Sequence, residues 1–271
     1  MQLFGIDFTS RPSPRKPITV AMGRRHGDTI VLEQVLHLDS FAAFEQQLRQ
    51  PGPWLAACDF PFGLPRELVE SLGWPQAWPT LIQRLHSQTR AQLVAQFKAF
   101  CAPRPAGNKF AHRRCDLIAR SSPSMKWVNP PVAFMLLEGA PRLLAAGISL
   151  PGLSTGDPQR IALEGYPALL ARSVVGSASY KSDEKAKQTA EREARRAQIV
   201  AALQAGAHPL GLRLVLNEAW ASRLIAEGSA DQLDAVLCLM QAGWAVTQAN
   251  YGLPAQIDPL EGWIVSTPWA D

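Results

Sequence analysis

Five acidic residues have positions that could support shared chemistry. Asp7, Asp59 and Glu164 each come at or near the end of a short apolar run that is typical of a buried β-strand. An unpaired carboxylate is costly to bury, so we expect each one at a strand end that faces a polar cleft. Ligands of open α/β sheets collect at the carboxyl ends of the strands, which makes this edge the expected site.

The other two acids, Asp231 and Asp234, lie in the first turn of the strongest helix pattern in the chain, which runs to about residue 247. Because they are three residues apart, both point from one face of the helix. For Asp231, a favourable interaction with the helix dipole is an alternative explanation. Asp234 lies within an apolar segment and needs a partner, which a metal ion, Lys or Arg would provide.

Clustered carboxylates repel one another, and a divalent cation relieves this repulsion. Oxygen ligands favour Mg²⁺ or Mn²⁺ over zinc. Two such ions about 4 Å apart would activate a water molecule and stabilise a leaving oxygen in phosphodiester cleavage. The acids therefore predict a two-ion site, formed by Asp7, Asp59, Glu164, Asp231 and Asp234.

The elements before residue 66 explain how the first two acids would meet. Three consecutive strands within residues 2–36 are expected to be antiparallel, and a helix over 40–50 leads to a strand over 54–59. A strand that returns to the sheet after a helix implies a parallel crossover. Asp7 and Asp59 would then sit at the carboxyl ends of neighbouring strands.

Residues 66–158 interrupt the alternation and predict a helical insertion, or cap, between core segments 1–65 and 159–271 of one structural domain. Residues 104–126 contain six Lys or Arg and one acid, which indicates a basic face. A solvated surface is the alternative interpretation. The candidate phosphate contacts are Arg113, Arg114 and Lys126 from this segment and Lys181 from the second core segment.

Composition excludes several classes of protein. The net charge of +4 fits a polyanionic partner. The four cysteines form no C-x-x-C pair, so we expect reduced thiols and not a disulfide framework or zinc site. No apolar run reaches the length of about 18 residues that a membrane span needs. The sequence therefore predicts a soluble, cytoplasmic protein, and it does not indicate an oligomeric state.

Four segments, in this order along the chain, resemble the DUF429 family of predicted nucleases in the ribonuclease H-like superfamily. They are Gly5–Asp7, Asp59–Pro65, Glu164–Pro167 and Asp231–Ala235. The resemblance implies a mixed five-stranded sheet, with three antiparallel strands followed by parallel crossovers and helices on both faces. It also implies metal-dependent cleavage or rearrangement of nucleic acid by Asp7, Asp59, Glu164 and either Asp231 or Asp234. The acidic pair here is spaced as Asp-Gln-Leu-Asp, whereas many relatives begin with Asp-Asp. The resemblance therefore does not decide whether Asp231 or Asp234 faces the metal.

Three hypotheses for function follow. The first is a metal-dependent nuclease. The sequence does not distinguish DNA from RNA as the substrate, or endonuclease from exonuclease activity. The second is an ATP-dependent phosphotransferase of the actin and sugar-kinase type, but the Asp7–Ser10 segment lacks the glycine pair of a phosphate loop. The third is a non-catalytic nucleic-acid-binding protein of the same fold. The nuclease hypothesis predicts four carboxylates around a common point, and a structure with Glu164 or Asp59 in a salt bridge away from Asp7 would refute it.

Overall fold

A computed structural model describes residues 1–268 of the chain. Its centre is a seven-stranded mixed sheet with the strand order β5-β6-β4-β1-β2-β3-β7. Strands β1, β2 and β3 are antiparallel neighbours, and β4, β6, β5 and β7 join the sheet in parallel. The strands are β1 (Gln2–Asp7), β2 (Ile18–His26), β3 (Thr29–Leu38), β4 (Trp54–Asp59), β5 (Ile148–Ser149), β6 (Asp157–Glu164) and β7 (Arg213–Val215).

The predicted mixed topology is confirmed, but the predicted count of five strands is wrong. The two additional strands, β5 and β7, are edge strands of two and three residues. Segments this short carry too few side chains to show a period of two. Near the C-terminus, Ile264 forms an isolated parallel bridge with Glu164.

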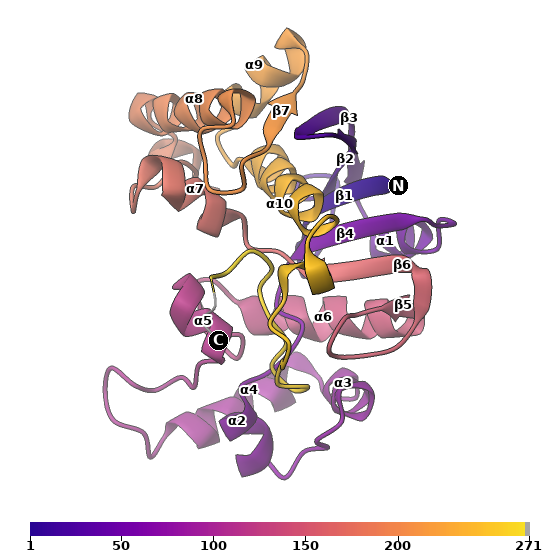
Figure 1. The fold of residues 1–271 in the computed structure, drawn as a ribbon. Coiled ribbons are helices and arrows are strands. Elements are labelled where there is room, and N and C mark those ends of the chain that lie inside the picture. Colours follow the sequence, from indigo (N-terminus) through magenta and orange to yellow (C-terminus); the bar gives the residue numbers. More distant parts are fainter. Residues whose placement is uncertain (269–271) are drawn as a thin grey trace.

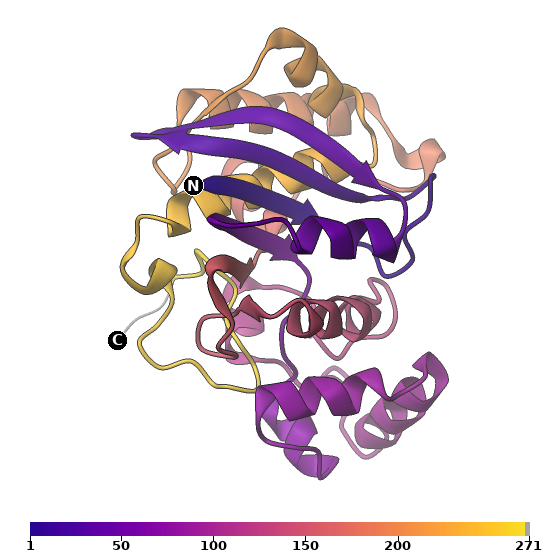
Figure 2. The same ribbon diagram turned by 90° about the vertical axis from the view of Figure 1, so that its right-hand side faces the viewer.

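Helices cover both faces of the sheet. Helix α1 lies against one face and α10 against the other (Figure 2), while α2, α3 and α4 group beyond α6, away from the strands (Figure 1). The segment from 66 to 158 contains helices α2 to α6 and also supplies β5. The helices are α1 (Phe41–Leu48), α2 (Arg66–Ser71), α3 (Trp78–His86), α4 (Arg90–Cys101), α5 (Arg114–Ala119), α6 (Val132–Ala145), α7 (Pro167–Val175), α8 (Ala190–Ala205), α9 (Glu218–Ala226) and α10 (Asp231–Ala245), with short 3₁₀ turns η1 (Lys185–Lys187) and η2 (Ala249–Gly252).

Alternation along the strands divides the core into two layers. On β4, Leu55 and Ala57 belong to the apolar cluster that contains α10, whereas Ala56 and Cys58 belong to the cluster on the α1 and α6 face. Successive side chains of a strand point to opposite faces of the sheet. The face that a strand-end acid reaches is therefore fixed by its place in this alternation.

Gly5 determines how closely α10 approaches the sheet. A Cβ atom on Gly5 would lie 2.0 Å from the carbonyl oxygen of Ala235 and 2.1 Å from the backbone nitrogen of Leu239. Only glycine tolerates such an approach of backbone to backbone. Because α10 packs directly on β1, its first turn lies beside the end of that strand, where Asp7 is located.

Candidate functional site

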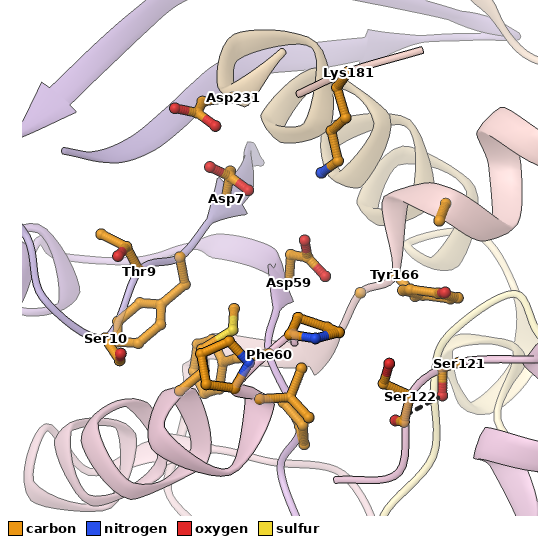
Figure 3. A pocket seen from close by; sticks show the side chains of 18 of the residues that line it. Asp7, Thr9, Ser10, Asp59, Phe60, Ser121, Ser122, Tyr166, Lys181 and Asp231 are labelled. Atoms are coloured by element: carbon orange, nitrogen blue, oxygen red, sulfur yellow. Dashed lines mark hydrogen bonds between the residues drawn. The ribbon is translucent and has the colours of Figure 1, made fainter. Parts of the chain in front are cut away.

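A cleft of about 670 Å³ opens at the carboxyl ends of β1, β4 and β6. Asp7 comes from the end of β1, Asp59 from the end of β4 and Asp231 from the first turn of α10. Figure 3 shows these three carboxylates and the ammonium group of Lys181 around the opening. Glu164 lines the same cleft, so four of the five acids predicted from the sequence border it.

Asp7 and Asp59 form the centre of this group. They are direct partners in the parallel pairing of β1 and β4, so their side chains leave the same face of the sheet at the same level. Within residues 1–268, neither carboxylate accepts a hydrogen bond or forms an ion pair. In the described part of the chain they are therefore adjacent acids without a hydrogen-bond or ion-pair partner.

Electrostatics disfavours the charged form of both groups. Burial, followed by the negative charges of Asp234 and Asp231, raises the pKa of Asp7 well above its ordinary value. Burial also raises the pKa of Asp59 to about 7, although the positive charge of Lys181 acts in the opposite direction. Such a pair is stabilised by a bound proton or by a bound cation.

Glu164 lines the same cleft but is oriented differently from this pair. It is in register with Cys58, one residue before Asp59, so its side chain leaves the opposite face of the sheet. Its two carboxylate oxygens accept hydrogen bonds from Arg113 Nη2 at 2.6 Å and Nη1 at 2.7 Å. The backbone N–H of Phe62 donates a further bond at 2.9 Å. This salt bridge contradicts the nuclease hypothesis in its predicted form, a metal site of four carboxylates, and Glu164 is removed from the expected ligand set.

Arg113 is a buried structural residue with 1% of its surface exposed. Besides Glu164, it donates from Nε and Nη2 to Asp116 at 3.1 and 2.8 Å, and from Nη1 to the carbonyl of Glu261 at 2.9 Å. These contacts engage all five N–H groups of the guanidinium. The expectation that Arg113 contacts phosphate is corrected accordingly, because no donor is left for such a ligand.

Of the other three predicted phosphate contacts, only one lies at the cleft. Arg114 is exposed and Lys126 is half-buried, and neither side chain lines the cleft. Lys181 does line it, and its ammonium pairs with Asp234. Of these candidate cations, Lys181 is the one suitably placed to meet a phosphate bound near Asp7.

The structure distinguishes the two acids at the start of α10. Asp234 is fully buried, where it pairs with Lys181 and accepts a hydrogen bond from Tyr180 Oη at 2.5 Å. The expected partner of Asp234 is therefore a lysine. Asp231 lines the cleft and pairs with Lys16 at 2.8 Å. Asp231 is thus the acid of this pair that faces the cleft.

A metal site with three or more ligands is not formed as the side chains stand. In the described part of the chain, no group of three or more His, Cys, Asp and Glu residues is arranged to hold a metal ion. The ion pairs explain this, because Glu164, Asp234 and Asp231 are each bound to a cationic side chain. Asp7 and Asp59 still fit one hard cation, since Mg²⁺ commonly binds one or two carboxylates and completes its shell with water and substrate phosphates. Two ions, as the sequence predicts, would lack ligands here.

Sequence reasoning missed several residues of the site. Lys16, from the loop after β1, joins Asp231 to Asp183 through bonds of 2.8 and 2.7 Å. Tyr166 lines the cleft at the start of α7, and Tyr180 supports Asp234. Tyr166 could have been predicted as a cleft residue, because it follows a strand-end acid by two residues. Lys16 and Tyr180 carry no such local signal.

Comparisons place the chain among known sequences. Residues 5–257 match the family model described as a protein of unknown function, DUF429. The comparisons with curated proteins and with solved structures gave no significant match.

Among residues 1–268, the helices are all too short or too polar to cross a membrane. The four cysteines are buried free thiols, as the sequence predicts.

Proposed function

The chain belongs to the DUF429 family, whose function is unknown, and from its site we propose a hydrolase that cleaves phosphodiester bonds of nucleic acid with one divalent cation, Mg²⁺ or Mn²⁺. The observation that carries the proposal is the pair of carboxylates on Asp7 and Asp59. They are neighbours in register, face the same cleft and have no protein partner within residues 1–268. The resemblance to ribonuclease H-like nucleases supports the same reaction.

Physical chemistry favours a cation between these two acids. Two adjacent carboxylates, buried on Asp7 and half-buried on Asp59, cannot both be charged at neutral pH without a compensating positive charge. Lys181 supplies part of that charge, but its ammonium is already paired with Asp234. A hard divalent cation accepts carboxylate oxygens and leaves positions open for a substrate phosphate. When bound, it would act as a Lewis acid on a phosphate oxygen.

The surrounding side chains are suited to positioning a phosphate. Lys181 brings positive charge to the cleft, and Thr9 and Ser10 place hydroxyl donors on the side near Asp7 (Figure 3). Asp231 lines the cleft at the start of α10, where Lys16 holds its carboxylate. In the proposed enzyme, Asp7 and Asp59 hold the cation, and Lys181 with the two hydroxyls orients the phosphate.

A cleavage assay tests the proposal. Purified protein is incubated with labelled single-stranded and duplex DNA and RNA, in Mg²⁺, Mn²⁺ or EDTA. We expect cleavage that requires the cation and that falls by about a hundredfold or more in Asp7→Asn and Asp59→Asn, because the lost charge stabilisation is worth several kcal/mol. The matched control is Asp39→Asn, which alters an exposed acid outside the cleft and should keep full activity.

Cation binding is measured separately by calorimetry with Mn²⁺. The proposal predicts one site per chain, absent in Asp7→Asn and kept in Asp39→Asn. Cleavage that persists in EDTA or in Asp7→Asn would contradict the proposal. Mn²⁺ binding without cleavage of any tested nucleic acid would favour the non-catalytic alternative.

A further inference from the structure

One side of the cleft presents apolar surface. It is formed at the starts of α6 and α7, where Pro131, Val132, Met135 and Tyr166 line the opening and keep part of their surface exposed. Figure 3 shows the ring of Tyr166 across the opening from Thr9 and Ser10, with Asp59 between them. A phosphate–sugar backbone gains little from apolar surface, whereas a planar base gains stacking and burial.

Tyr166 is held in place at this side of the cleft. It is the N-cap residue of α7, and its backbone N–H donates to Gln241 Oε1 at 2.9 Å. Gln241 is itself buried in α10. The guanidinium carbon of Arg172 lies 5.2 Å from the centre of the tyrosine ring. A ring fixed in this way loses little conformational freedom when a base stacks on it.

The cleft has few cations for a strongly charged duplex. Lys16, Lys181 and Arg113 line it, but each is paired with a carboxylate. Proteins that bind duplex DNA through its backbone commonly neutralise about six to ten phosphates. Hydroxyl groups are more abundant around the opening and can bond to sugars and base edges without charge. The hydroxyl-bearing lining residues are Thr9, Ser10, Ser121, Ser122, Ser179, Ser182 and Ser229.

From these observations we infer that the cleft binds a single strand of nucleic acid through one unstacked base, which lies on Tyr166 and against the apolar start of α6. The neighbouring phosphodiester then lies over Asp7 and Asp59, a placement that rests on the proposed function. The volume of about 670 Å³ falls within the usual range for small-ligand pockets and suits one nucleotide unit. A base inside a duplex is stacked on its neighbours and cannot use this surface.

Fluorescence anisotropy tests the inference on the full chain. The probes are a fluorescein-labelled single-stranded DNA decamer and its duplex, in Ca²⁺, with gels to verify that both stay intact. We expect the single strand to bind about tenfold or more tightly than the duplex. Tyr166→Leu keeps apolar bulk but loses the flat ring, and should weaken single-strand binding about tenfold, while Tyr166→Phe stays within about twofold.

Two further variants make the test independent of folding defects. Met135→Gln, at a half-exposed position in the α6 part of the same apolar surface, should weaken single-strand binding several-fold. Trp220→Ala is the matched control, because Trp220 is a half-exposed aromatic with an arginine 5.1 Å away but lies outside the cleft. It should bind like the wild type. Melting curves verify that each variant is folded.

The outcomes separate this inference from the proposed function. Equal affinity for duplex and single strand, or wild-type binding by both Tyr166→Leu and Met135→Gln, would overturn the inference even if the protein cleaves duplexes. Single-strand binding that depends on Tyr166, without cleavage in Mg²⁺ or Mn²⁺, would uphold the inference and contradict the proposed hydrolase.

Discussion

Replacing Glu164 with glutamine separates the role that the sequence suggests for this acid from the role that the structure gives it. In the structure, one carboxylate oxygen accepts from Arg113 Nη2, and the other accepts from Arg113 Nη1 and the N–H of Phe62. In Glu164→Gln, one of these oxygens is replaced by an amide NH₂ group. At either position this group is a donor that faces another donor, so a hydrogen bond is lost. The variant also leaves a buried guanidinium with one fewer negative partner.

The magnitude follows from the burial of the pair. Removing one partner of a buried ion pair costs about 3–5 kcal/mol. For a domain of this size, each kcal/mol lowers the melting temperature by about 2–4 °C. Because Asp116 still faces Arg113 at 2.8 Å, the lower part of the range applies, and we expect a fall on the order of 10 °C. Differential scanning calorimetry in EDTA at neutral pH measures it.

Asp7→Asn is the matched comparison, because it also removes a carboxylate of the cleft, but one that has no ion-pair partner to lose among residues 1–268. Burial and neighbouring acids raise the pKa of Asp7, and the group has no partner within residues 1–268. Neutralising it should therefore raise the melting temperature in EDTA and abolish the stabilisation that Mn²⁺ gives. If Glu164→Gln instead behaved like Asp7→Asn in both respects, Glu164 would be a cation ligand and our account of its salt bridge would be refuted.

Three further predictions concern the elements around the cleft. Gly5→Ala places a Cβ 2.0 Å from the carbonyl oxygen of Ala235, so it should destabilise the protein by about 3 kcal/mol in urea unfolding; an unchanged midpoint would contradict the close packing of α10. In EDTA, stability should fall as pH rises from about 4 to about 7, because the pKa of Asp59 rises from 3.8 to about 7 on folding; Asp59→Asn should flatten this slope, and a slope unchanged in that variant would argue against the shift. Tyr180→Phe removes the hydroxyl that donates to buried Asp234 and should cost about 1–3 kcal/mol in thermal unfolding, whereas wild-type stability would show that the bond is absent.

The framework of the sheet could be predicted because it depends on local pattern. Strands β1 to β4 and β6 have six to ten residues each and contain apolar segments, and Ser40 caps α1 by accepting from the N–H of Ala43. The short strands β5 and β7 could not be predicted, since two or three residues have no measurable period. The start of α10 depends on a longer-range contact, because Ala230 is the N-cap and the Glu227 carboxylate accepts from the N–H of Gln232.

The site was predicted only in part because strand register and long-range ion pairs are not local properties. Asp7 and Asp59 meet as expected, since both follow from the parallel crossover. Glu164 comes one register step earlier than Asp59, which turns its side chain to the other face of the sheet. Its partner Arg113 is 51 residues away in the chain, and no spacing rule connects the two.

The most direct test of the central claim is anomalous diffraction from crystals soaked in Mn²⁺. Our account predicts one anomalous peak in the cleft, from an ion coordinated by carboxylate oxygens of both Asp7 and Asp59. Glu164 should keep its salt bridge with Arg113. A peak bound by Glu164, or a cleft without Mn²⁺ at a concentration that saturates the protein in solution, would contradict it.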